Sequence, residues 1–209
     1  MKGGVPMSRR WLAERKREPY HRMAKEQGYR SRAAFKLLQL DQKYGFLRGA
    51  RYVLDVGAAP GGWLQVVSEA VGPNGLVVGV DLVRIESFEA ENVRTIVGDI
   101  LEEKTMDTIR EMFPGRVDIV LSDLSPNVSG VWDLDQYRQI ELARAALNLA
   151  KTLLKPRGWF VVKVFQGSEY DAFLKELRKD FGFVKTEKPK ASRKASAETY
   201  VLCSKLYST

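Results

Sequence analysis

The stretch between residues 51 and 63 constrains the fold more than any other part of the chain. It begins as RYVLDV, an apolar and β-branched strand, and continues as GAAPGGW, a turn that leads into a helix near Gly62. Glycine lets a ligand approach the backbone where a Cβ would block it, and a helix N-terminus offers unpaired N–H groups to polar ligand atoms. In doubly wound α/β folds such a turn lies at the carboxyl end of a strand, where ligands bind.

The composition of this turn separates two classes of nucleotide cofactor. A dinucleotide site has the pattern G-x-G-x-x-G, but Ala59 stands at its middle glycine here. Asp55, two residues before Gly57, is an acceptor suited to a ligand ammonium group, such as that of S-adenosylmethionine. A second strand ends in Asp81, whose carboxylate can accept hydrogen bonds from ribose hydroxyls. The pattern favours S-adenosylmethionine, while a nicotinamide oxidoreductase stays an alternative that a test of NAD binding would settle.

Strands and helices alternate along the rest of the chain. Apolar runs predict strands over residues 51–56, 76–80, 92–97, 117–121, 159–165 and 200–203. Helical periodicity predicts helices over residues 32–44, 62–71, 101–113, 137–154 and 168–181. We expect Ser31 to cap the first helix and Gly45 to end it, the segment 156–158 to stop the fourth, and residues 185–194 to form a basic loop. This alternation predicts an α/β fold with a largely parallel sheet and helices on both faces.

The net charge of +8 is concentrated at the N-terminus. Residues 1–36 hold 11 of the 34 Lys and Arg residues and 3 of the 26 Asp and Glu residues, so the remainder of the chain is balanced. Such asymmetry indicates a polyanionic partner. Within a basic arm over residues 1–30 and the start of the domain over 31–209, we expect RNA contacts from Arg9, Arg10, Arg15, Lys16, Arg17, Arg30 and Arg32.

Composition also excludes several classes of protein. No apolar run approaches the roughly 20 residues of a membrane helix, and no secretory signal is recognisable. The chain has one cysteine, Cys203, and one histidine, so an internal disulfide framework or a His/Cys metal site is not expected. These features predict a cytoplasmic protein that binds neither a membrane nor a metal.

Charged side chains are expected to gather at one edge of the sheet. Asp81, Asp99 and Asp123 each follow a predicted strand, and the carboxyl ends of parallel strands share one edge. Lys163 interrupts the apolar strand WFVVKVF, and a buried lysine is costly unless it is paired. Candidate partners are Asp123 and Glu198, with a second cation from Lys36. Burial and a neighbouring cation lower the pKa of a lysine while carboxylates raise it, so the sequence leaves the charge state of this cluster open.

Seven segments together resemble one enzyme family. YRSRAAFKLLQLD, LDVGAAPGGW, VDL, GDI, LSDLSPNVSG, FVVKVFQG and ETYVL occur in the order and spacing of the FtsJ/RrmJ-type ribosomal RNA methyltransferases. The resemblance implies one Rossmann-like, S-adenosylmethionine-dependent methyltransferase domain with a mostly parallel seven-stranded sheet. It implies 2′-O-ribose methylation of a uridine in large-subunit, 23S-type ribosomal RNA, with a catalytic tetrad of Lys36, Asp123, Lys163 and Glu198. Together with the turn, it assigns cofactor binding to Asp55, Gly57, Gly61, Trp63, Asp81, Asp99 and Asp123.

In this interpretation Lys163 accepts the proton of the ribose hydroxyl, Asp123 orients it, and Lys36 and Glu198 complete the cluster. We expect a monomer that acts on ribosomal RNA within the large subunit, although free RNA is an open alternative. A second function stays possible, because an RNA-binding assembly factor with a vestigial cofactor pocket would carry the same arm; titration with S-adenosylmethionine and a methyl-transfer assay would separate the two.

Overall fold

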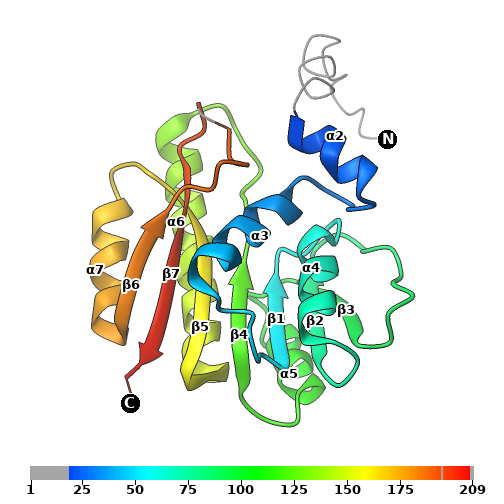
Figure 1. Ribbon diagram of the computed structural model, residues 1–209. Helices are drawn as coiled ribbons and strands as arrows, with labels where there is room; N and C mark the ends of the chain where they lie inside the picture. The colour runs from blue at the N-terminus through cyan, green and yellow to red at the C-terminus, as the bar shows by residue number, and fades with distance from the viewer. Residues whose placement is uncertain (1–18, 194, 208–209) are drawn as a thin grey trace, which may run out of the picture.

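A seven-stranded sheet forms the centre of the molecule (Figure 1). The structure is a computed structural model that describes residues 19–193 and 195–207. The strand order is β3-β2-β1-β4-β5-β7-β6. The first five strands are parallel, and β7 pairs antiparallel with both β5 and β6. The α/β class, the strand number and the mostly parallel arrangement are therefore confirmed. Five expected RNA-binding residues lie outside the described residues: Arg9, Arg10, Arg15, Lys16 and Arg17.

Each strand of the sheet is rich in apolar and β-branched residues, as expected for strands buried on both faces. Val53, Leu54, Val120 and Val161 are fully buried at its centre. The strand bounds are β1 (Tyr52–Val56), β2 (Leu76–Asp81), β3 (Val93–Val97), β4 (Val117–Ser122), β5 (Leu154–Phe165), β6 (Phe181–Glu187) and β7 (Glu198–Leu206).

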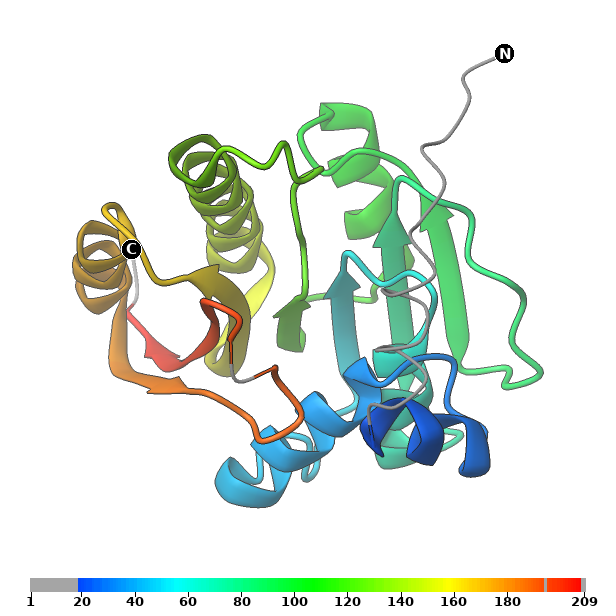
Figure 2. The same cartoon turned by 90° about the horizontal axis from the view of Figure 1, so that it is seen from above.

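Helices cover both faces of the sheet (Figure 2). One face packs against α3 (Ala33–Tyr44) and α4 (Gly62–Val71), and a short helix, α2 (Pro19–Glu26), lies against α3. The other face packs against α5 (Glu103–Met112), α6 (Trp132–Leu153) and α7 (Tyr170–Asp180). The sheet therefore has an apolar core on each of its two faces. The carboxyl ends of the five parallel strands lie at one edge of the sheet, between these two layers of helices.

Several local predictions were wrong. Arg32, not Ser31, is the N-cap of α3, and no side-chain hydrogen bond caps the helix; the Ser31 hydroxyl is buried without a partner among the described residues. Gly45 does end α3, with φ of 67°. Helix α6 begins at Trp132, five residues early, because the Asp135 carboxylate accepts hydrogen bonds from the backbone N–H groups of Ser129 and Gly130 and organises its first turn.

The carboxyl-terminal third also contains more strand than predicted. Helix α6 ends at Leu153, one residue from the predicted end and just ahead of residues 156–158. Those residues lie inside β5, which starts at Leu154 and has an irregular register where it pairs with the start of β4. The expected basic loop over 185–194 is in part β6, an edge strand whose FGFVKTE pattern alternates too weakly to be recognised. The segment that follows β6, residues 188–193, packs against α2 and α3 through Ala191.

Candidate active site

The four predicted tetrad side chains meet above the carboxyl ends of β4 and β5. Lys163 lies near the end of β5, and its Nζ is 3.2 Å from Asp123 Oδ1 and donates to the Asp123 carbonyl at 2.7 Å. Lys36 belongs to α3, which covers one face of the sheet. Its Nζ is 2.6 Å from Glu198 Oε1 at the start of β7. Both lysines are only 5% exposed. The site therefore contains two buried ion pairs, Lys163 with Asp123 and Lys36 with Glu198.

Tyr200 joins these two ion pairs, and the sequence analysis missed it. Its hydroxyl donates to Asp123 Oδ1 at 2.7 Å and accepts a hydrogen bond from Lys36 Nζ at 3.1 Å. The ring is fully buried and lies directly opposite Lys163 in the antiparallel pairing of β5 with β7. A signal did exist, because Glu198 and Tyr200 are two residues apart on a strand and therefore face the same way.

Burial and neighbouring charges set the acidity of this cluster. Burial alone would raise the pKa of Asp123, but the Lys163 and Lys36 cations and the hydrogen bond from Tyr200 outweigh it and lower this pKa. Burial, together with the Asp123 and Glu198 carboxylates, raises the pKa of the Tyr200 phenol well above its usual value. The cluster therefore holds Asp123 as a carboxylate and Tyr200 as a neutral hydrogen-bond donor at neutral pH.

Helix α6 holds the backbone on either side of Lys163. The Gln139 side chain donates to the Lys163 carbonyl at 2.6 Å and accepts from the Phe165 N–H at 2.9 Å. One turn earlier, Gln136 Oε1 accepts from the backbone N–H of Ser168 at 3.1 Å. Both glutamines are 1% exposed. These contacts fix the end of β5, and the sequence analysis did not identify either glutamine.

The predicted cofactor turn lies beside this cluster, after β1. Gly57 has φ of +76°, and a Cβ there would approach the backbone of Leu124 to 3.0 Å, so only glycine fits. Gly61 has φ of +107° and is covered by Phe88, whose ring would be 2.8 Å from an added Cβ. Trp63 is buried, donates its indole N–H to the Ala33 carbonyl at 2.7 Å, and packs on the Tyr200 ring. Its indole therefore ties α4 to the tetrad.

Three carboxylates near the turn are placed to bind a nucleoside that carries an amino-acid group. Asp55 is fully buried, and neither of its side-chain oxygens has a hydrogen-bond partner among the described residues. Burial raises the pKa of Asp55 well above its usual value, and Asp123 and Asp81 add to this. Asp81 accepts from the backbone N–H groups of Ala59 and Val83, both at 2.9 Å, which orients its carboxylate at the end of β2.

The orphaned Asp55 carboxylate, the glycine turn and the oriented Asp81 match an ammonium, a close backbone approach and a ribose, the groups that S-adenosylmethionine carries. Asp99, after β3, is half-buried and accepts from the Leu101 N–H at 2.9 Å. The residues present therefore fit this cofactor.

Two of the predicted RNA contacts are described, and each has a place near the site. The Arg30 guanidinium donates to the carbonyls of Glu86 and Ser87 at 2.7 and 2.6 Å and lies 3.7 Å over the Phe88 ring. Arg30 therefore fastens the segment before α3 to the loop that follows Asp81. Arg32 lies close enough to Tyr200 for its charge to act on the phenol pKa.

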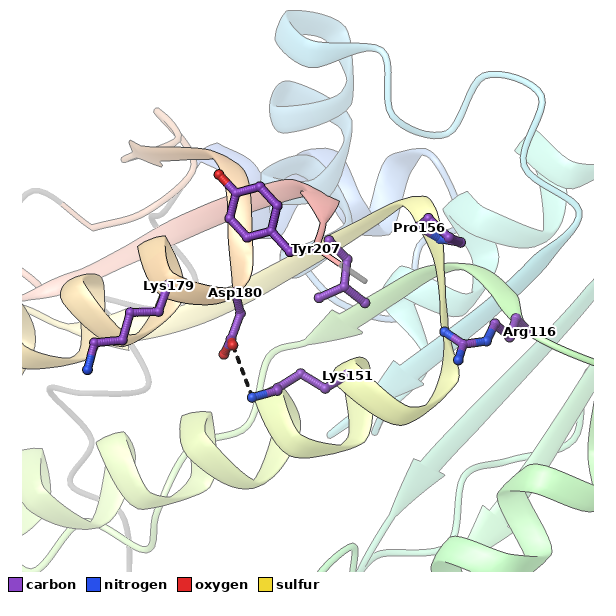
Figure 3. Close-up of a pocket in the computed structure, with 7 residues that line it drawn as sticks. Arg116, Lys151, Pro156, Lys179, Asp180 and Tyr207 are labelled. Atoms are coloured by element: carbon purple, nitrogen blue, oxygen red, sulfur yellow. Dashed lines mark ion pairs between the residues drawn. The ribbon is translucent and has the colours of Figure 1, made fainter. Parts of the chain in front are cut away.

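Other sites offer less. Among residues 19–193 and 195–207, no group of three His, Cys, Asp or Glu side chains is placed to hold a metal ion, and no helix is long and apolar enough to cross a bilayer. A pocket of about 490 Å³ lies at the amino ends of β4 and β5, where Lys151 pairs with Asp180 at 3.1 Å (Figure 3). None of the predicted site residues lines this pocket.

Comparison with known proteins agrees with this geometry. The FtsJ-like methyltransferase model matches residues 29–206. The chain belongs to the FtsJ-like methyltransferase family. It is therefore a methyltransferase, and the family resemblance of its motifs is confirmed.

Relatives and one solved structure extend this finding. A protein of Methanothermobacter thermautotrophicus named ribosomal RNA large subunit methyltransferase E is 50% identical over 94% of this chain and 93% of its own length. A protein of the same name from Methanocaldococcus jannaschii is 48% identical over 93% of this chain and 80% of its own. A Plasmodium falciparum crystal structure described as a ribosomal RNA methyltransferase has a TM-score of 0.76 and 29% identity, covering 87% of this chain and all of its own.

Proposed function

We propose that this FtsJ-like methyltransferase transfers a methyl group from S-adenosylmethionine to a ribose 2′-hydroxyl of a uridine in large-subunit ribosomal RNA. The single observation that carries the proposal is the buried cluster of Lys36, Asp123, Lys163, Glu198 and Tyr200 beside the glycine turn. The names of the relatives support ribosomal RNA of the large subunit as the substrate. We further propose that the protein acts as a monomer in the cytoplasm and on the assembled subunit.

The proposed cofactor would bind between the turn after β1 and the ends of β2 and β4. Asp55 would receive the ammonium, Asp81 the ribose hydroxyls, and the N–H groups at the start of α4 the remaining polar atoms, with Asp99 and Asp123 closing the site. When bound, S-adenosylmethionine supplies a methyl group on a positively charged sulfur, which is electrophilic without a metal. The protein must then hold the attacking oxygen in line, and positioning of this kind can supply up to about 7–11 kcal/mol of the barrier reduction.

We assign the proton of the 2′-hydroxyl to Lys163. A ribose hydroxyl is a poor nucleophile and must lose its proton as the O–C bond forms, so an amine within hydrogen-bond reach is needed. Asp123 fixes the position of Lys163 Nζ through its carboxylate and its carbonyl. Lys36, paired with Glu198 and bonded to Tyr200, places a second amino group in the same cluster.

The basic arm would hold the RNA. Residues 1–30 carry nine basic side chains and three acidic ones, and cations that neutralise phosphates release counterions and tighten binding. Arg9, Arg10, Arg15, Lys16, Arg17, Arg30 and Arg32 are the proposed contacts. Among them, Arg30 also donates from its guanidinium to two backbone carbonyls.

The decisive experiment maps ribose methylation by mass spectrometry in large subunits treated with the wild-type protein, Lys163→Ala or Lys163→Arg. Arginine keeps the cation beside Asp123 but stays protonated near pH 7. We expect one methylated uridine with wild type, no product with either variant, and S-adenosylmethionine affinity within about twofold of wild type for both. Lys151→Ala, at the far edge of the sheet, is the matched control and should retain full activity. Substantial turnover by Lys163→Arg would show that the lysine is not the proton acceptor.

A further inference from the structure

An exposed apolar surface borders the tetrad on the side of α6. It consists of the loop after Asp123 and the first turns of α6, and its large side chains are Val128, Val131, Trp132, Leu134 and Tyr137. Trp132 is 48% exposed and Tyr137 is 54% exposed. A group of large apolar side chains exposed together on a folded protein often marks a binding surface.

Trp132 connects this surface directly to the reaction centre. Its indole stacks on the Phe165 ring, with centroids 6.1 Å apart and planes 17° from parallel. Phe165 is two residues after Lys163 on β5 and pairs in register with Glu198. Gln139, on the same helix as Trp132, donates to the Lys163 carbonyl and accepts from the Phe165 N–H. The outer face of the indole is thus placed near the position where the ribose must lie.

The charge of the surface distinguishes what can bind there. Between residues 128 and 138 the charged side chains are Asp133, Asp135 and Arg138. The Asp135 carboxylate accepts hydrogen bonds from the backbone N–H groups of Ser129 and Gly130. Asp133 and Arg138 are exposed. A surface with this balance does not attract a phosphate backbone. It fits the face of a nucleobase, which is apolar, aromatic and uncharged.

We infer that Trp132, supported by Phe165, is a stacking platform for an unpaired base adjacent to the methylated nucleotide. The inference rests on the proposed function, since it names a further part of the substrate site. A 2′-hydroxyl that is brought against Lys163 must leave a regular helix, and its neighbouring base then loses a stacking partner. Proteins that bind splayed RNA bases replace that partner with an aromatic ring.

The test compares Trp132→Phe with Trp132→Leu, because leucine keeps an apolar side chain over Phe165 but has no aromatic face. Both are assayed on unmethylated large subunits and on protein-free ribosomal RNA from them. Stacking of one base is worth about tenfold in affinity, so Trp132→Leu should raise KM for RNA about tenfold on both substrates. We expect kcat and KM for S-adenosylmethionine within twofold of wild type, and near-complete rescue by Trp132→Phe. Tyr207→Leu, an exposed ring at the opposite edge of the sheet, is the matched control and should behave as wild type.

A second measurement does not depend on the variants folding equally well. RNA fragments with 4-thiouridine next to the target ribose should photocrosslink to the peptide that contains Trp132 and Tyr137. Equal KM values for Trp132→Leu and wild type, or no rescue by phenylalanine, would overturn the inference. A defect on subunits but not on protein-free RNA would instead assign the surface to a ribosomal protein. If the wild-type protein methylates neither substrate, the proposed function itself fails and this inference with it.

Discussion

Replacing Tyr200 by phenylalanine removes one oxygen atom from the centre of the cluster and leaves the ring in place. The Asp123 carboxylate loses a hydrogen bond of 2.7 Å and keeps Lys163 at 3.2 Å. Lys36 loses an acceptor at 3.1 Å and keeps Glu198 at 2.6 Å. Each ion pair survives, but the bond that connects the two pairs is gone.

The size of the effect follows from these contacts. A hydrogen bond to a charged group contributes about 1.5–3 kcal/mol, and the surviving partners limit the loss to the lower part of this range. Because 1.4 kcal/mol is a factor of ten, we expect kcat to fall about 10- to 30-fold. The KM for S-adenosylmethionine should change less than twofold, because Tyr200 faces the lysines. Stability to urea should fall by about 1–3 kcal/mol, the cost of leaving a buried polar group under-bonded.

The pH profile supplies a second readout. The Tyr200 hydroxyl is one of the groups that lower the pKa of Asp123, so its removal raises that pKa. The Asp123 carboxyl group should therefore titrate at a higher pH in Tyr200→Phe than in wild type, a shift that NMR of its carboxyl carbon measures directly. Tyr170→Phe, which also loses a hydroxyl contact but at the surface between α7 and β6, is the control. A kcat within twofold of wild type together with an unchanged titration of Asp123 would refute the role of Tyr200.

Three further predictions concern the cofactor side and the arm. Asp55→Asn should weaken S-adenosylmethionine binding yet stabilise the free protein by about 1–3 kcal/mol at pH 7.5 and little at pH 4. The reason is that a carboxyl group whose pKa is raised in the folded state costs stability only as the pH rises above its pKa in the unfolded state. Urea unfolding at both pH values tests this, and a larger gain at pH 4 contradicts it. Asp81→Ala should raise the S-adenosylmethionine dissociation constant at least tenfold in calorimetry and leave RNA affinity unchanged; unaltered cofactor affinity would remove Asp81 from the site. Arg30→Ala should raise the same constant severalfold, because the loop after Asp81 loses two hydrogen bonds and its stacking on Phe88, whereas Arg22→Ala should not; a loss of RNA affinity alone in Arg30→Ala would restore it to the RNA contacts.

The sequence predicted the parts of the site that leave a local mark. Lys163 was recognisable because a charge inside an apolar strand is unfavourable without a partner, and the glycine turn because it breaks a dinucleotide pattern. Tyr200 left only the weak mark of lying two residues after Glu198, since a tyrosine in an apolar strand is ordinary until the antiparallel register places it opposite Lys163. The role of Arg30 was equally hidden, because its partners are backbone carbonyls 56 and 57 residues away.

The fold showed the same division. The parallel strands and most helices follow from apolar runs and periodicity, which are local. The start of α6 depends on the Asp135 carboxylate reaching back to Ser129 and Gly130, and β6 exists because β7 offers it an edge. Both depend on contacts that a pattern of single residues does not contain, so their bounds were missed.

The pairing of β5 with β7 has a consequence for how activity is acquired during synthesis. Glu198 and Tyr200 belong to the last strand of the sheet to be translated, yet they sit between strands that are made earlier. A nascent chain that has emerged only as far as α7 contains the glycine turn, Lys163 and Asp123, but it lacks Glu198 and Tyr200, which contact Lys36. We therefore expect competence for methyl transfer to be gained only when β7 pairs with β5 and completes the cluster.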